Sequence, residues 1–187
     1  IKPTFGDIDS DNDLDLMLGQ ADGTILYYSN TAGQGNFPVY TLVQPQLTNN
    51  SGNPIDVGQA SSPQLVDVNR DGKLDLIIGE RSSNINYYEN TGTPLSPEFT
   101  LNNPNFGGVN VNTYPFLYSY SNPVLVDSAG IYTLFVGAAV GYIYQYSNID
   151  NNLNGTFTLV DSMYYDIYEP YRSTLDIADI NGDGKVE

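Results

Sequence analysis

Short apolar runs separated by polar, glycine-rich breaks make up most of the chain. The segment SPQLVDVNRDGKLDLIIGE, residues 62–80, has two such runs on either side of an acidic stretch. The segment INYYEN, residues 85–90, alternates and is rich in aromatic side chains, and TFTLV, residues 156–160, is a further short run. Runs of this length bounded by Asn, Asp and Gly predict β-strands. Because no stretch shows sustained helical periodicity, the pattern predicts an all-β protein.

The strand pattern recurs along the chain. KPTFGDIDSDNDLDLMLGQ, residues 2–20, aligns with residues 62–80, and GTILYYSNT, residues 23–31, aligns with SNINYYENT, residues 83–91. A third copy covers residues 122–149 and a fourth begins at 173. Each full copy closes on a short run around a phenylalanine, namely Phe37, Phe99 and Phe157. We therefore divide the single domain into repeats at 1–60, 61–120, 121–172 and 173–187, the last incomplete.

The repeat length predicts the architecture. Four strands in about 60 residues form one blade of a β-propeller, in which four-stranded sheets are arranged radially. A β-sandwich or a linear array of similar units is the alternative. Propellers typically have ~4–8 blades, and this chain holds three blades and the start of a fourth. We therefore expect it to be part of a larger propeller, with segments such as residues 44–63 as loops between blades.

An acidic loop follows the first predicted strand in three of the copies. Oxygen-bearing side chains stand at its positions 1, 3, 5 and 9, and position 6 is Gly or Asn, which tolerate a left-handed turn. Position 7 is predicted to contribute its backbone carbonyl, and we expect the Asp13 side chain there to face solvent. The candidate metal ligands are Asp7, Asp9, Asp11, Asp13 and Asp15 in the first loop, Asp67, Asn69, Asp71, Lys73 and Asp75 in the second, and Asp179, Asn181, Asp183, Lys185 and Glu187 in the fourth.

Hard oxygen ligands in this number favour Ca²⁺, which takes 6–8 of them, over Mg²⁺, which keeps its waters. The alternative is a set of metal-free turns, since Asp, Asn and Gly favour turns anyway. An EF-hand is excluded because its position-12 Glu is replaced by Leu18 and Ile78, and the flanks are strands. The third copy keeps only Asp127, with Ala129 and Ile131 in place of oxygens. We predict two to three calcium sites and none in the third repeat.

Composition narrows the partners and the chemistry. The chain has 22 acidic and 6 basic residues, a net charge of −16, and neither Cys nor His. Such a surface repels nucleic acid and anionic membrane. Zinc, haem and iron–sulfur sites, and Ser-His-Asp or Cys-His centres, lack their ligands within these residues. The uncharged stretch 128–149 is broken by glycines and tyrosines, so we expect two strands there and no membrane insertion.

DIDSDNDLDLMLG, residues 7–19, and DVNRDGKLDLIIG, residues 67–79, resemble the FG-GAP (VCBS-like) repeats of integrin-α-type propellers. The resemblance implies a propeller, often seven-bladed, that carries Ca²⁺ in the loop between the first two strands of a blade. Residues 23–31 and 84–91 are similar to strands of bacterial secreted propellers. This second likeness implies a secreted, extracellular or cell-surface location, with outer-membrane export or surface-attachment machinery as partners.

Three functions remain open. The first is a calcium-stabilised binding or adhesion module whose loop face takes a protein or carbohydrate ligand. The second is a propeller-fold polysaccharide-degrading enzyme, and the third is a structural spacer in a larger secreted protein. We favour the first and expect no enzyme, because no catalytic constellation is visible.

Tyrosines at fixed blade positions are expected to pack within sheets, and non-repeating aromatic residues are the candidates for ligand contact or for bridging blades. The repeating set is Tyr27, Tyr28, Tyr87, Tyr88, Tyr144 and Tyr146, and the non-repeating set is Tyr114, Phe116, Tyr118, Tyr120, Tyr164, Tyr165, Tyr168 and Tyr171.

Overall fold

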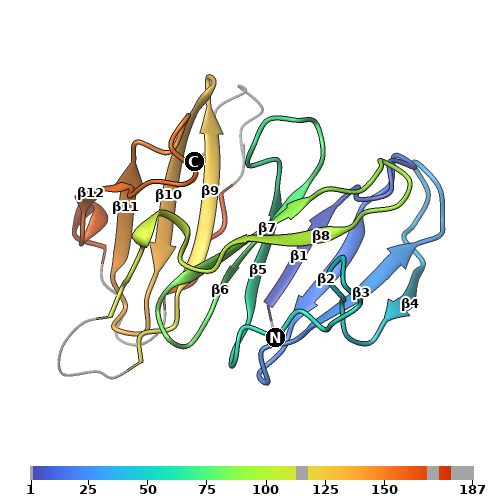
Figure 1. The fold of residues 1–187 in the computed structure, drawn as a ribbon, viewed down its shortest axis with the longest axis horizontal. Helices are drawn as coiled ribbons and strands as arrows, with labels where there is room; N and C mark the ends of the chain where they lie inside the picture. Colours follow the sequence, from blue (N-terminus) through green and yellow to red (C-terminus); the bar gives the residue numbers. More distant parts are fainter. Residues whose placement is uncertain (1, 113–117, 168–172, 178–187) are drawn as a thin grey trace.

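The computed structural model describes residues 2–112, 118–167 and 173–177. It contains three four-stranded antiparallel sheets, in each of which the strands follow one another in chain order. This arrangement confirms the predicted all-β class built from propeller-type blades (Figure 1). The strands are β1 (Lys2–Gly6), β2 (Asp15–Gly19), β3 (Ile25–Asn30) and β4 (Tyr40–Gln44); β5 (Ser62–Val66), β6 (Asp75–Gly79), β7 (Ile85–Asn90) and β8 (Phe99–Asn103); and β9 (Asn122–Ser128), β10 (Ile131–Gly137), β11 (Ile143–Ser147) and β12 (Thr158–Asp161).

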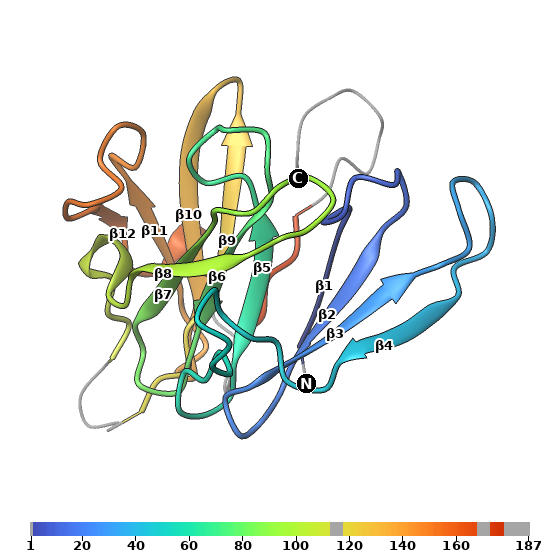
Figure 2. The same cartoon turned by 45° about the vertical axis from the view of Figure 1, so that its right-hand side comes forward.

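The three sheets stack face to face, and their first strands β1, β5 and β9 lie next to one another (Figures 1 and 2). One core cluster joins the first blade to the second, with Met17 and Ile25 packed against Leu76 and Ile78. A second cluster joins the second blade to the third. The cores therefore lie between blades, because each strand alternates and buries side chains on both faces of its sheet.

The segments between blades complete these cores. Ile55 of the segment after β4 is fully buried in the first cluster, and Phe106 of the short 3₁₀ turn η1 (Phe106–Gly108) is fully buried in the second. The Phe106 ring lies 5.0 Å from that of Tyr87 and 4.8 Å from that of Phe157, centroid to centroid. A second 3₁₀ turn, η2 (Tyr164–Asp166), follows β12. The predicted inter-blade loops are thus packed segments, because their apolar residues fill the space between two sheets.

A repeated serine joins each blade to the next. The Ser121 hydroxyl accepts the Glu80 backbone N–H at 2.9 Å and donates to the Asn84 carbonyl at 2.6 Å, so it ties the start of β9 to the β6–β7 hairpin. A Cβ added to Gly79 would lie 2.1 Å from the Ser121 carbonyl oxygen, so only glycine fits this approach. The same contacts recur with Ser61 against Gln20 and Thr24, and with Ser173 against Ala138 and Tyr142.

Two further side chains link neighbouring first strands. The Thr4 hydroxyl accepts the Leu65 backbone N–H at 3.1 Å. Gln64, at the equivalent position of the next blade, accepts the Leu125 N–H at 2.7 Å and donates to the Leu125 carbonyl at 3.1 Å. These bonds satisfy backbone groups at the edges of β5 and β9, which would otherwise lack partners.

One repeat equivalence was wrong. Phe99 begins β8 and is buried, and Phe157 is buried just before β12, whereas Phe37 lies outside β4 and is 94% exposed. The fourth strand of the first blade begins only at Tyr40. Phe37 therefore belongs to the β3–β4 loop, where no neighbouring element covers it.

The repeating tyrosines behave largely as predicted. Tyr27, Tyr87, Tyr88, Tyr144 and Tyr146 are buried. Among the non-repeating aromatics, Tyr118 and Tyr165 are exposed, and the Tyr164 ring packs 4.9 Å from that of Phe135, centroid to centroid. The candidates Tyr114, Phe116, Tyr168 and Tyr171 lie outside the described residues. No helix in the described part of the chain has the length and apolar character needed to cross a membrane.

Candidate metal loops

The first acidic loop connects β1 to β2 and is held by its own carboxylates. Asp7 accepts the backbone N–H groups of Asp11 and Asn12, both at 3.1 Å, and Asp11 accepts that of Asp13 at 3.0 Å. Ser10 and Asn12 have left-handed backbones, with φ of 61° and 69°. The short acidic side chains therefore accept backbone N–H groups that would otherwise bond to backbone carbonyls, and these bonds hold the loop in a tight turn.

The second loop, between β5 and β6, has the same form. Asp67 accepts the N–H groups of Asp71 at 3.1 Å and Gly72 at 2.9 Å, and Asp71 accepts that of Lys73 at 2.9 Å. The left-handed positions are Arg70 and Gly72, with φ of 62° and 85°. The two loops differ in residue type at positions 2, 3, 4, 6 and 7. They share one backbone conformation because positions 1 and 5 make the same bonds.

Loop one brings three carboxylates together. Asp7, Asp9 and Asp11 each offer an oxygen, and these oxygens lie within 4.8 Å of one another. The Asp9 Oδ1 atom is buried and has no hydrogen-bond partner among the described residues. Burial raises the pKa of Asp9, and the neighbouring charges, first that of Asp11, raise it further. Such an arrangement of like charges is costly unless a cation neutralises it.

Loop two carries less charge at the same positions. The Asn69 amide oxygen accepts the Asp71 N–H at 2.9 Å, and its NH₂ donates to Glu89 at 3.3 Å. The ammonium of Lys73 lies 3.2 Å from Asp71. Burial raises the pKa of Asp71. Hydrogen bonds from Lys73 and its positive charge lower that pKa by more, so the net shift is downward. Asp67, Asn69 and Asp71 offer the oxygens of this loop.

Position 9 is buried beneath each loop. Asp15 is fully buried and accepts the Asn30 N–H at 2.9 Å, and Asp75 is fully buried and accepts the Asn90 N–H at 2.8 Å. Asp75 also accepts the Tyr87 hydroxyl at 3.1 Å. Burial raises the pKa of both carboxyls to about 6, against their hydrogen bonds, which lower it. Neither belongs to the three-carboxylate cluster of loop one, and both connect the loop to the third strand of the blade.

The expected orientation of Asp13 was wrong. Its side chain is buried, and its carboxylate accepts the Gly33 backbone N–H at 2.9 Å. The β3–β4 loop of the same blade covers this position. In loop two the equivalent Lys73 donates to the Gly92 carbonyl at 3.4 Å. Position 7 therefore connects the acidic loop to the loop between the third and fourth strands of its own blade. The side chain is an acceptor in the first blade and a donor in the second.

Sequence reasoning missed the residue that organises this end of the first and second blades. Asn30 ends β3, and its side-chain oxygen accepts the N–H groups of Ala32 at 3.2 Å and Val39 at 2.9 Å. Asn90 ends β7 and does the same for Gly92 and Glu98. Both asparagines fall in the matched segments 23–31 and 83–91, so their recurrence was the available signal.

The structure describes the loop of the third copy but not that of the fourth. Asp127 accepts the Gly130 N–H at 2.8 Å and pairs with the guanidinium of Arg70. The fourth-loop candidates Asp179, Asn181, Asp183, Lys185 and Glu187 lie outside the described residues. The absence of calcium from the third blade stays a prediction.

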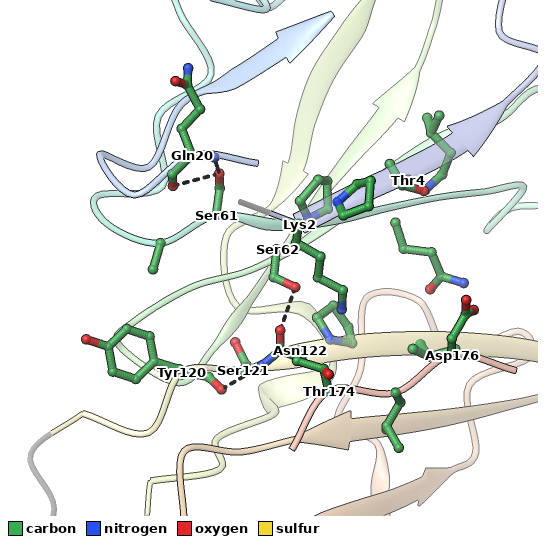
Figure 3. A pocket seen from close by; sticks show the side chains of 18 of the residues that line it. Lys2, Thr4, Gln20, Ser61, Ser62, Tyr120, Ser121, Asn122, Thr174 and Asp176 are labelled. Atoms are coloured by element: carbon green, nitrogen blue, oxygen red, sulfur yellow. Dashed lines mark hydrogen bonds between the residues drawn. The ribbon is translucent and has the colours of Figure 1, made fainter. Parts of the chain in front are cut away.

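A cavity lies against the first strands of the three blades. It has a volume of about 860 Å³ and is lined by residues of β1, β5, β9 and the segment 173–177 (Figure 3). Ser62 donates to the Asn122 amide oxygen at 3.0 Å across it. The Lys2 ammonium is buried there without a hydrogen-bond partner among the described residues. Burial lowers its pKa to about 8, although Asp176 raises it.

Residues 7–78 match the family model of the FG-GAP-like repeat. This part of the chain is similar to the FG-GAP-like repeat. The match spans both described acidic loops, strands β2 to β5 and most of β6. FG-GAP-like repeats are typical of extracellular proteins. Comparisons with curated proteins and with solved structures found no match.

The donor set of both FG-GAP-like loops fits a calcium ion. All the side-chain ligands are hard oxygens. A cation would satisfy the Asp9 Oδ1 atom, which has no hydrogen-bond partner within residues 2–112, 118–167 and 173–177. In loop one the ion would be held by Asp7, Asp9, Asp11 and the Asp13 carbonyl, with Asp15 as the remaining candidate at position 9. In loop two the corresponding groups are Asp67, Asn69, Asp71, the Lys73 carbonyl and Asp75.

Proposed function

We propose that the chain is a calcium-stabilised binding module that works outside the cell as part of a larger secreted or surface-attached protein. The observation that carries the calcium part is the loop-one cluster. There Asp7, Asp9 and Asp11 converge, and a buried oxygen of Asp9 has no hydrogen-bond partner in the part of the chain that the structure describes. An ion there would neutralise the mutual repulsion of the carboxylates and fix the connection between β1 and β2.

Thermal unfolding with added calcium or with EDTA tests this role. A ligand that binds only the folded state stabilises it, by about 2.7 kcal/mol at a hundredfold excess over Kd. We expect calcium to raise Tm by several degrees in the wild-type chain, and Asp11→Ala to remove part of that rise. Glu98→Ala, which removes an exposed acidic side chain outside the loops, is the matched control and should keep the full response.

Two results would contradict the calcium proposal. An unchanged Tm on adding calcium would leave the loops as metal-free turns. An equal response to Mg²⁺ at the same concentration would point to general screening of the −16 net charge instead of a selective site.

The binding part of the proposal is supported by the end of the blades opposite the acidic loops. There the guanidinium of Arg81 lies 4.0 Å from the centroid of the half-exposed Tyr118 ring. Aromatic and Arg side chains are enriched in protein interfaces, and an aromatic ring also offers a face to a sugar. We propose that a protein or carbohydrate ligand contacts this pair.

A mutation separates contact from packing at Tyr118. Glycan and protein arrays would first identify a ligand of the wild-type chain. Tyr118→Ala should then lower affinity for that ligand with Tm unchanged, whereas unchanged affinity with a lower Tm would assign the ring to packing. Turnover of a polysaccharide by the chain would instead favour the enzyme alternative.

A further inference from the structure

Arg70 extends from the acidic loop of the second blade to the third blade. It occupies position 4 of loop two, between the candidate ligands Asn69 and Asp71. Its guanidinium pairs with Asp127, donates to Asp150 at 3.0 Å and donates to the Gly130 carbonyl at 3.1 Å. One side chain thus contacts both carboxylates and a carbonyl at the end of the neighbouring blade.

These partners surround the place where the third copy has lost its metal ligands. Asp127 is the position-1 aspartate of that copy, and the β9–β10 loop turns immediately after it through Ala129 and Gly130, both left-handed. The hard oxygens left there are two carboxylates and a carbonyl, and the cation that they receive is a guanidinium. Arg is suited to this role because it is always charged and presents several donors in a fixed plane.

A second contact joins the same two blades. The Tyr132 hydroxyl donates to the backbone carbonyl of Asp67, the position-1 residue of loop two. The Tyr132 ring lies under the guanidinium, 3.9 Å from centroid to guanidinium carbon, and the Tyr132 N–H donates to Asp150 at 2.9 Å. The residues of the second blade that make these contacts, Asp67 and Arg70, therefore both belong to the candidate calcium loop, at positions 1 and 4.

We propose that Arg70 supplies the cation of the third blade in place of a metal ion, and that through Arg70 and Tyr132 calcium binding in loop two is coupled to docking of the third blade. The inference rests on the proposed calcium role of loop two. Arg70 is not itself a candidate ligand, but it would couple ion binding in loop two to the interface between the second and third blades.

The physical basis is the position of Arg70 in the loop. Its left-handed backbone is flanked by the two residues whose side chains would hold the ion, so an ion that fixes them also fixes the direction in which Arg70 leaves the loop. Binding energies coupled in this way are reciprocal. A docked third blade must therefore raise the calcium affinity of loop two by the factor by which calcium favours docking.

The first interface lacks this device. Position 4 of loop one is Ser10, which has the same backbone φ but a side chain too short to reach across a blade interface. The residue of the second blade that corresponds to Tyr132 is Leu74, which has no hydroxyl to donate. The coupling is thus a property of the interface between the second and third blades, and loop one serves as an internal control.

Calorimetric calcium titration in two backgrounds tests the proposal. Both backgrounds also carry Asp179→Ala, which removes a candidate ligand of the fourth loop. In them Asp11→Ala impairs loop one and leaves loop two to be measured, and Asp71→Ala does the reverse. We expect Arg70→Ala to weaken calcium binding about fivefold in the Asp11→Ala background and to leave it unchanged in the Asp71→Ala background. Ser10→Ala should change neither. Arg70→Lys, which keeps the charge but loses the planar fork, should lie between, and it replaces Arg70→Ala if that variant fails to fold.

The outcomes separate this inference from the function on which it rests. If the Asp11→Ala chain binds calcium and Arg70→Ala leaves its affinity unchanged, the coupling is refuted while the calcium role stands. If the wild-type chain binds no calcium at all, the proposed function fails and the coupling falls with it. Equal weakening in both backgrounds would also overturn the inference, because it would show a general effect of charge.

Discussion

The carboxylate of Asp75 accepts the backbone N–H of Asn90 at 2.8 Å, and both residues are buried. The bond joins the first residue of β6 to the last residue of β7. Its counterpart in the first blade joins Asp15 to Asn30. Position 9 of both described acidic loops is therefore part of the framework of the blade, whether or not an ion binds there.

Replacement of Asp75 should destabilise the chain even without calcium. Asp75→Ala leaves the N–H groups of Val68 and Asn90 and the Tyr87 hydroxyl without their acceptor. Because buried unsatisfied donors each cost about 1–3 kcal/mol and there are three of them, we expect a loss of about 3 kcal/mol or more. Urea unfolding in EDTA measures it. Asp71→Ala, which removes an exposed loop carboxylate, should cost less under the same conditions, and equal losses would contradict the framework role.

The two buried position-9 carboxyls predict a pH dependence of the calcium-free chain. Each has its pKa raised from 3.8 to about 6, so the folded state binds more protons than the unfolded state between these values. Their contribution to stability is complete below about pH 4 and is lost as pH rises through about 6.

Urea unfolding at several pH values in EDTA measures this dependence. Asp75→Asn should flatten the fall in stability between about pH 4 and 6, because one titrating group is removed. A wild-type curve that rises over this range, or one that Asp75→Asn leaves unchanged, would contradict the assignment.

Close approach between blades predicts that Gly79 is intolerant of a side chain. Gly79→Ala would place a methyl group 2.1 Å from the Ser121 carbonyl oxygen, so the second and third blades must separate locally. We expect a loss above about 3 kcal/mol. Gly52→Ala is the control, because a Cβ there meets open space and only the left-handed backbone resists it, at about 1 kcal/mol. Similar losses in both variants would argue against the contact.

Two phenylalanines outside the strands should respond very differently to truncation. Phe106 is fully buried between the second and third blades, and Phe106→Ala should cost about 3–5 kcal/mol. Phe37 is 94% exposed, and Phe37→Ala should change stability by less than about 0.5 kcal/mol. Thermal or urea unfolding compares them directly. A large loss in Phe37→Ala would mean that the β3–β4 loop is covered in solution.

The strands and the acidic loops could be predicted because their causes are local. Residues 85–90 form β7 as the aromatic alternation indicated, and the 60-residue offset placed both described loops between the first two strands of a blade. Within a loop, Asp7 and Asp67 bond to N–H groups only four and five residues away. The types and spacing of the residues are sufficient to specify such turns.

The sequence by itself therefore determined the repeat, the strand order within each blade and the internal bonding of each acidic loop. Only the tertiary structure decided that Asp13 is buried, that Phe37 is exposed and that Arg70 meets Asp127 and Asp150. Those outcomes depend on partners that are 20 residues away in the case of Gly33, and 57 and 80 residues away in the case of Arg70. Residues that far apart in the sequence come into contact only when the chain folds and the sheets stack. The spacing of residues along one strand does not predict which residues of the next blade will contact it.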